Sequence, residues 1–206
     1  MIIANFGGWN IVNIPTSPAL SSLEFTAVDT VAVSVSPFSN NQQVQDWQSS
    51  FLTASATLPP MTNAQAQPWI AWNLQLHGRA NTFQLGDPLM TSPQGSPSGT
   101  PLTNGTQSGY SLITDGWTAS HSNLLLPGDW VQIGYRLYRN IDPVNSDSSG
   151  NATLNIWPQI RESPSNNSPL ILSNTKGLWR LKSNSRKWSM TNMKLYGMQF
   201  EIVEAL

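Results

Sequence analysis

The chain contains no cysteine, which excludes disulfides, zinc-thiolate sites, iron–sulfur clusters and thiol catalysis. Charge is also scarce, because Asp, Glu, Lys and Arg make up only 10% of the 206 residues and the formal net charge is -1. Such a balance provides no overall attraction to nucleic acid or to anionic lipid. Solubility must therefore come from uncharged polar residues.

Long apolar runs are missing as well. No stretch approaches the eighteen or so apolar residues that a membrane-spanning helix needs. The N-terminal sequence MIIANFGGWNIVNIP has no basic region and is interrupted by glycine and asparagine, so we expect no signal peptide there. The sequence predicts no contact with a membrane.

What the chain does contain favours β structure. Apolar residues make up 39% of the chain, which is enough for one sizeable core or two small ones, and there are nine Trp and fifteen Pro. Together with abundant Ser, Thr, Asn and Gln, this composition is typical of strand-and-turn proteins. We therefore expect a mainly β fold.

Two alternating segments and one helical segment dominate the first half. Residues 25–38 and 43–59 alternate apolar and polar positions, which predicts two antiparallel strands. The period then changes, and we predict a helix at about 63–77, with Thr62 as its cap and Gly78 as its left-handed stop. The segment NTFQLGDP that follows predicts a short strand ending in a turn.

Residues 90–106 are rich in Ser, Pro, Gly and Thr, which indicates a linker or loop. Beyond it, short strands alternate with turn signals at the spacing of a small sandwich or barrel, and residues 130–137 resemble a half-buried hairpin. We therefore predict a β-sandwich or barrel platform, formed by 1–98 and 176–206 and carrying the helix, with a smaller β-barrel, 99–175, inserted into it.

The apolar positions of the expected strands and helix define a candidate core. It consists of Val31, Val33, Val35, Leu52, Ile70, Leu74, Phe83, Leu85, Val131, Ile133, Leu154, Ile156, Leu181, Phe200 and Ile202.

The few groups that could support chemistry are explained by local structure. His77, Arg79 and Asp87 fall at the predicted helix end, after its glycine stop and in the Asp-Pro turn. Asp115, His121 and Asp129 could be imagined as metal ligands, but both aspartates lie in glycine turns.

Two further carboxylate-rich segments lead to the same conclusion. The oxygen-rich loop 142–151 lacks the Glu of a calcium-binding EF-hand, and a plain hairpin loop explains it better. Glu201 and Glu204 point to opposite faces of a strand, so they do not form a hydrolase pair. We predict no catalytic, cofactor-binding or metal-ligating residue and no cofactor.

Basic residues are concentrated near the C-terminus. Six of the ten lie between 176 and 194, and no acid occurs between Glu162 and Glu201. Interleaved with Trp179 and Trp188, they could bind single-stranded nucleic acid, but a domain built for that task usually carries a basic excess overall. We favour a subunit interface or a polar cavity, and include Arg79 just past the helix. The candidates are Arg79, Lys176, Arg180, Lys182, Arg186 and Lys187.

Most of the chain also resembles a known family. The segments that carry the resemblance are, in order, SPF…QQVQDW, LPPMTNAQAQPWIAWNLQLHGRANTFQLGDP, LLPGDWVQIGYRLYR, GNATLNIWPQIRESP and KGLWRLKSNSRKWSM…YGMQFEIVEAL. This order is similar to small tail proteins of tailed bacteriophages, of the distal tail or baseplate-hub type. These motifs belong to a structural family and specify no reaction.

The resemblance implies a structural virion protein rather than an enzyme. It implies a ring, usually a homohexamer, at the distal end of the tail tube, which joins the tube to the tip or baseplate and lets DNA pass during genome ejection. The partners would be other copies of the chain, the tail tube protein and tail-tip or hub proteins, with DNA only in transit. Assembly would take place in the bacterial cytoplasm and the product would reside in the virion tail.

Other functions remain open from the sequence. Another phage ring protein, from the tail tube, the tail terminator or the neck, would share this composition. A carbohydrate-binding tail module would present several exposed tryptophans on one sheet face. A hydrolytic tail enzyme would need an acid pair or a site built on His77 or His121.

Overall fold

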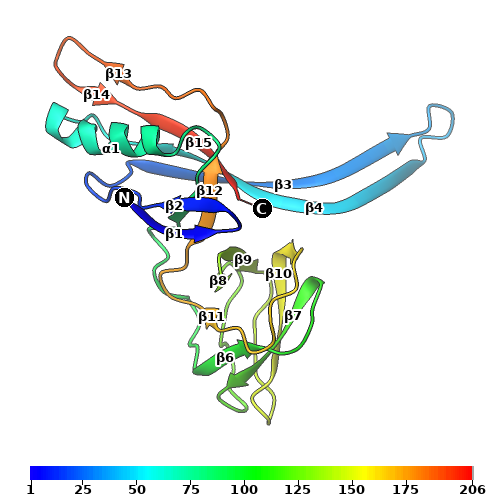
Figure 1. Cartoon of the computed structure of the whole chain (residues 1–206). Coiled ribbons are helices and arrows are strands. Elements are labelled where there is room, and N and C mark those ends of the chain that lie inside the picture. Colours follow the sequence, from blue (N-terminus) through cyan, green and yellow to red (C-terminus); the bar gives the residue numbers. More distant parts are fainter. Residues whose placement is uncertain (206) are drawn as a thin grey trace.

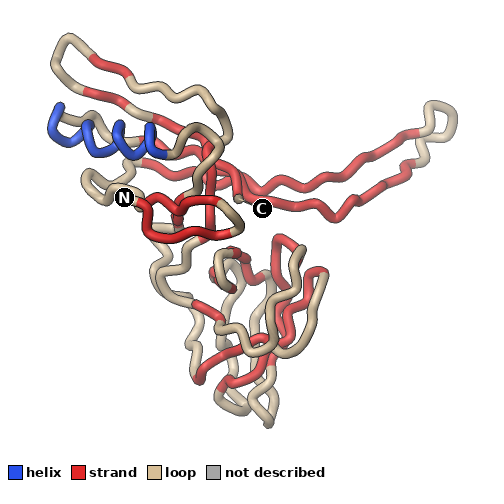
Figure 2. The backbone as a smooth tube through the Cα atoms, in the orientation of Figure 1, coloured by secondary structure: helices blue, strands red, loops and turns tan. Residues whose placement is uncertain are grey.

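The computed structural model describes residues 1–205 and is mainly β, with 47% of residues in strands and a single helix in that part of the chain (Figures 1 and 2). A five-stranded sheet and a six-stranded, barrel-like sheet hold most of the strands, and two small hairpins complete the fold. The expected fold class, mainly β with one helix and a barrel-like part, is confirmed.

The five-stranded sheet is the platform, and its strands are antiparallel in the order β3-β4-β15-β12-β5. These strands are β3 (Ser22–Val35), β4 (Gln42–Thr57), β15 (Gln199–Glu204), β12 (Gly177–Leu181) and β5 (Phe83–Leu85). The predicted antiparallel pairing of the first two is confirmed by thirteen residue pairs, from Ser22–Thr57 to Val35–Gln42.

The helix α1 (Asn63–Gln75) packs on this sheet through tryptophan. Trp72 lies 5.0 Å from Phe83 and 5.2 Å from Phe200 between ring centroids, and Trp69 is buried beside it. Large aromatic side chains dominate such a core because each buries a large apolar area. The face of the platform under the helix is therefore an aromatic core.

The ends of α1 follow the predicted signals, with one difference. Thr62 precedes the helix, and its backbone N–H donates to Oε1 of Gln65 at 3.0 Å. The helix ends at Gln75, two residues before the predicted end, because His77 already has a φ of 49° and Gly78 one of 67°. The left-handed turn that releases the chain from the helix therefore starts one residue before the glycine.

The six-stranded sheet has the order β11-β8-β9-β10-β7-β6. A bridge between Leu102 and Pro169 brings its two edges together, so that it nearly closes. Its strands lie between the boundaries predicted at 98 and 176, and they are β6 (Gly99–Thr103), β7 (Gly109–Trp117), β8 (Trp130–Ile133), β9 (Arg136–Asn140), β10 (Ala152–Ile160) and β11 (Leu170–Ile171).

The segment 90–106 is only partly the loop that its composition indicated. β6 occupies Gly99–Thr103, and Gly95 packs so closely on the chain that a Cβ there would lie 2.5 Å from the carbonyl oxygen of Leu124. The expectation of a linker or loop is correct for 90–98 and 104–106 and wrong for 99–103, which form a strand.

The hairpin β8–β9 is buried on both faces, so the expectation of a half-buried hairpin was wrong. Trp130 and Leu137 pack into the core of the platform, whereas Val131 and Tyr138 pack into the core of the barrel. Even Gln132 is buried, where its Oε1 accepts the backbone N–H of Lys176 at 2.7 Å. The hairpin is therefore the layer that the platform and the barrel share.

Two short hairpins flank the platform. β1 (Ile2–Phe6) pairs with β2 (Trp9–Val12), a hairpin that the sequence pattern did not indicate. Near the other end of the chain, β13 (Ser189–Met190) pairs with β14 (Tyr196–Gly197). In Figure 1 the second hairpin extends above α1.

The β3–β4 hairpin continues far beyond the platform. β15 pairs with β4 only at Thr53–Thr57, so the part of the hairpin beyond a bulge at Asp29–Val31 has no third strand. Figures 1 and 2 show it as a long two-stranded ribbon that leaves the body of the molecule. Residues 30–48 are called the arm below.

The predicted core is correct in the platform and barrel and wrong in the arm. Val31, Val33 and Val35 are exposed because no layer lies against the arm, and Leu74 is exposed on the outer side of α1. Leu85 is only partly buried. The remaining predicted members are all buried, namely Leu52, Ile70, Phe83, Val131, Ile133, Leu154, Ile156, Leu181, Phe200 and Ile202.

Candidate functional site

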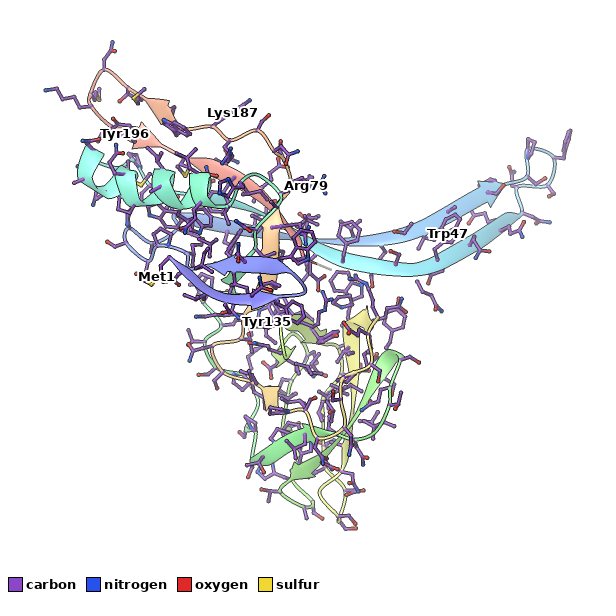
Figure 3. All side chains as sticks on the ribbon, viewed as in Figure 1. Met1, Trp47, Arg79, Tyr135, Lys187 and Tyr196 are labelled. Carbon is purple, nitrogen blue, oxygen red and sulfur yellow. The ribbon has the colours of Figure 1, made fainter. Side chains whose placement is uncertain are left out.

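The arm carries the most unusual surface of the molecule. Val33 is 56% exposed, Val44 60%, Trp47 57%, and Phe38 at the tip 98%. Figure 3 shows Trp47 on the arm, well away from the body. Clustered exposed apolar side chains mark contact surfaces, whereas isolated ones need no explanation. The arm is therefore a candidate interaction surface.

One face of the arm is especially uniform. Val31, Val33 and Val35 share a face because alternate residues of a strand point to the same side, and Val44 lies on that face because it pairs with Val33. Asp46, paired with Val31, is on the same side. We call these four valines and Asp46 the valine face.

Contacts at its root hold the arm in place. The indole Nε1 of Trp157 in β10 donates to Oδ1 of Asp29 at 2.9 Å, and the side-chain amide of Gln159 donates to the carbonyl of Gln48. Both contacts connect the barrel to the start of the arm. The start of the arm is therefore fastened to the barrel as well as to the platform.

The basic residues do not form one continuous strip. Arg180 lies over the ring of Trp9, with 5.0 Å between its Cζ and the ring centroid. Burial lowers the pKa of Arg180, and the charge of nearby Arg79 lowers it further. Arg79 itself is anchored through its backbone N–H, which donates to Oδ1 of Asn184 at 3.1 Å.

Two other basic residues are engaged separately. Lys182 forms an ion pair with Glu201 at 3.0 Å. Arg186 donates from Nη1 to the carbonyl oxygens of Asn73 and Leu74, at 3.2 and 3.1 Å, at the C-terminal end of α1. A cation there interacts favourably with the helix dipole and adds a donor to carbonyls of the last turn. The nucleic-acid alternative is weakened further because Trp179 is fully buried.

Arg186 and Lys187 line a groove of about 980 Å³ beneath the β13–β14 hairpin. Its apolar residues include Leu58, Trp188 and Phe200, and Glu201 lies at its border. We call this the basic groove. Figure 3 shows Lys187 on the segment that leads into β13, on the opposite side of the body from the arm. The structure thus separates the arm and the basic groove across the molecule.

His77, Arg79 and Asp87 have local roles, as the sequence indicated. His77 occupies the left-handed turn after α1, and Oδ1 of Asp87 accepts the backbone N–H of Leu89 at 3.0 Å, a bond typical of an Asp-Pro turn. Each of the three has its own separate contacts or backbone role.

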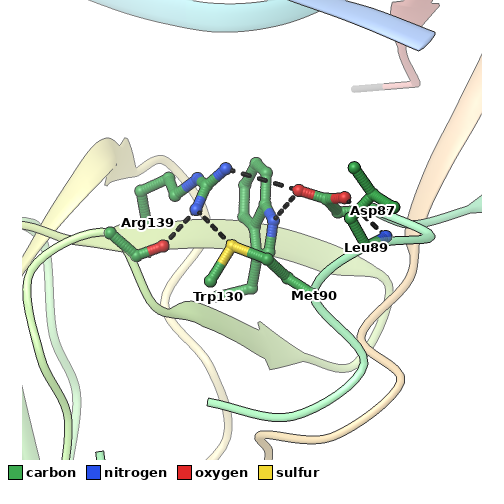
Figure 4. Close-up of polar contacts among 6 residues, drawn as sticks. Asp87, Leu89, Met90, Trp130 and Arg139 are labelled. Atoms are coloured by element: carbon green, nitrogen blue, oxygen red, sulfur yellow. Dashed lines mark hydrogen bonds and ion pairs between the residues drawn. The ribbon is translucent and has the colours of Figure 1, made fainter. Parts of the chain in front are cut away.

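Asp87 also belongs to a junction that sequence reasoning missed (Figure 4). Its Oδ2 accepts the indole N–H of Trp130 at 3.2 Å and lies 3.6 Å from Nη2 of Arg139. The Arg139 guanidinium stacks on the Trp130 ring, with its Cζ 3.7 Å from the centroid, and Nη1 approaches Sδ of Met90 at 3.2 Å. Burial lowers the pKa of Arg139, and Asp87 and Asp129 oppose this effect. The platform loop and the barrel are joined here by a partly buried ion pair.

A second buried cluster lies where β15, β9 and β10 meet. Glu204 is 3.8 Å from Arg161, and its Oε2 accepts the backbone N–H of Leu52 at 3.4 Å. Burial raises the pKa of Glu204, although Arg161 opposes the shift, and burial also raises the pKa of Tyr138 to about 12. Glu201 is exposed on the other face of the strand, as the spacing predicted.

Two other carboxylates considered above, Asp129 and Asp147, accept hydrogen bonds from the backbone. Asp129 accepts the N–H groups of Gln94, Gly95 and Leu126 at 2.7, 3.2 and 2.8 Å, which fixes the turn before β8. In the loop 142–151, Asp147 accepts the N–H groups of Ser149 and Asn151 at 2.8 Å each. Within residues 1–205, no three His, Asp or Glu side chains gather as a metal site would require.

Compared with known proteins, the chain matches no protein-family model and no curated protein. In the described part of the chain, no helix is long and apolar enough to span a membrane.

Proposed function

We propose that the chain is a structural protein of a bacteriophage tail that assembles into a ring at the distal end of the tail tube. In this role it connects the tube to the tip or baseplate and leaves a passage for DNA. The family resemblance of its sequence motifs and the mainly β fold support the proposal.

The observation that carries the proposal is the arm. Its valines, Trp47 and Phe38 have no cover in the protomer, and exposed apolar surface costs about 25 cal/mol per Å² relative to burial. A two-stranded ribbon is also marginally stable alone and presents unpaired strand edges. A neighbouring copy that covers the arm removes both costs, and repetition of such a head-to-tail contact generates a ring when the rotation between neighbours closes.

The carbohydrate-binding alternative finds less support. A sugar-binding sheet would place several exposed tryptophans side by side. The most exposed tryptophans are Trp9, Trp47 and Trp188, which lie on β2, on the arm and next to β13. Their separation on three elements favours assembly over a shared sugar platform.

Electron microscopy of the purified chain and of the virion tests the proposal. We expect a ring, sixfold in the favoured case, and labelling of the virion at the distal end of the tail. A monomer at all accessible concentrations would rule out the ring, and a ring next to the capsid would refute the assigned position.

A further inference from the structure

The arm and the basic groove have opposite charge character. The arm, residues 30–48, contains one charged residue, Asp46. The basic groove is lined by Arg186 and Lys187, with Glu201 at its border. Complementary charge on two surfaces speeds their encounter and fixes their register.

The lining of the basic groove suits the valine face. Leu58, Met198 and Phe200 form an apolar floor, and Trp188, which is 38% exposed, adds an apolar wall. Arg186 is held at the end of α1, whereas Lys187 makes no ion pair within residues 1–205. Lys187 is therefore available for a carboxylate from outside the protomer.

Size distinguishes the basic groove from a more apolar pocket of the molecule. That pocket, lined by Ile14, Leu20, Leu85 and their neighbours, holds about 300 Å³. The basic groove holds about 980 Å³. Two strands spaced about 4.8 Å apart, with their side chains, need the larger space.

The arm cannot occupy the groove of its own protomer. In Figure 1 the arm extends to the far right, while the β13–β14 hairpin that covers the groove lies at the upper left. A contact between such separated surfaces joins different copies. Because the two surfaces differ, the contact is head-to-tail and generates a ring if the rotation closes.

We propose that the valine face of one protomer docks into the basic groove of the next, with Asp46 facing Lys187. This proposal rests on the proposed function in one respect, since it presupposes that the chain associates with itself. It goes further by assigning the two surfaces, the charge pair and the direction of the contact.

Charge reversal tests the pair. Lys187→Glu places a carboxylate opposite Asp46, and we expect the dissociation constant of the assembly to rise about tenfold or more, by sedimentation velocity at 150 mM NaCl or below. The double variant Asp46→Lys with Lys187→Glu restores a favourable pair and recovers most of the loss. Lys194→Glu, with the same change of net charge on an exposed residue outside the groove, leaves assembly unchanged.

A disulfide trap tests the contact directly, because the cysteine-free chain offers a clean background. One variant carries Val44→Cys on the valine face and another carries Ser189→Cys in the groove. Mixing the two under mild oxidation should produce a mixed dimer linked between 44 and 189. Ser34→Cys, on the opposite face of the same arm, is the matched control and should link far less.

The outcomes separate the two proposals. Assembly that is lost in Lys187→Glu and restored in the double variant, with the 44–189 link, supports the docking. A wild-type ring that persists in Lys187→Glu and gives no 44–189 link overturns the docking and leaves the ring intact. A wild-type chain that stays monomeric at every concentration overturns both.

Discussion

The β3–β4 hairpin has two parts, the root, where residues 53–57 of β4 pair with β15, and the arm. Both parts alternate apolar and polar residues, but the apolar side chains are buried at the root and exposed in the arm. At the root, Leu52, Ala54 and Ala56 are buried against α1 and the aromatic core. In the arm, Val31, Val33 and Val35 follow the same period and are exposed. The difference is the presence of an opposing layer. The apolar side chains of an alternating strand are thus buried only where another layer of the protein packs against that face.

The largest expected difference comes from matched truncations in these two regions. Leu52→Ala should lower the free energy of unfolding by about 2 to 5 kcal/mol, because it leaves a cavity in a packed core. Val33→Ala should change it by less than about 0.5 kcal/mol in the dilute protomer. Urea unfolding at a concentration below assembly measures both. Equal losses would contradict the contrast between root and arm.

A smaller effect is expected at the junction of platform and barrel. Asp87→Ala removes the acceptor for Trp130 and the partner of Arg139, and should cost about 1 to 3 kcal/mol because buried donors lose their partner. Asp142→Ala in the exposed barrel loop is a control, for which we expect little change. Thermal unfolding of the two variants side by side measures the difference. An Asp87→Ala protein as stable as wild type would mean that the junction contributes nothing.

The stability of the root should depend on pH, unlike that of the arm, because the buried carboxyl group of Glu204 accepts the backbone N–H of Leu52 there. Burial raises the folded-state pKa of Glu204 above the usual carboxyl value, so the folded protein holds this proton more tightly than the unfolded chain does. Stability from this group is present below the unfolded pKa and is lost as the pH rises through the folded pKa. Glu204→Gln should flatten that decline, measured as unfolding free energy between pH 4.5 and 7.5.

Glu201→Gln provides the comparison for this experiment, because Glu201 is exposed on the other face of the same strand. It should leave the slope of stability against pH close to that of wild type. If both variants change the slope equally, a general loss of negative charge explains the effect and the burial of Glu204 does not.

The smallest effect concerns the attachment of the arm. Asp29→Ala removes the acceptor for the Trp157 indole, which is an exposed hydrogen bond, so global stability should change by less than about 1 kcal/mol. Local opening of the arm should become easier, and the amides of residues 42–48 should exchange hydrogen faster while those of residues 53–57 do not. Uniform exchange along β4 in the variant would argue against a separately held arm.

Much of the fold could be predicted from the sequence, because its signals are local. Alternation predicted the pairing of β3 and β4, Thr62 marked the start of α1, and Gly78 lies three residues beyond its end. The exposure of the arm could not be predicted, because it depends on β15 ending its pairing at Thr53. That is a property of strands far apart in the chain.

In the candidate site, too, contacts between segments far apart in the chain could not be predicted from the sequence. Charge counting found the basic region, but only the fold separates Lys182, paired with Glu201, from Lys187 in the groove. The contact of Asp87 with Arg139 and Trp130 was missed because the segments meet only in three dimensions. A local pattern predicts which residues are unusual. It does not predict what they touch.

The shared hairpin β8–β9 has a mechanical consequence. Neighbouring residues of one four-residue strand, Trp130 and Val131, are anchored in two different cores. A twist of the barrel relative to the platform would have to pull one of them out of its core. The arm is fastened to β10 of the barrel, so tension on the arm acts on the barrel, and the shared hairpin couples the barrel to the platform.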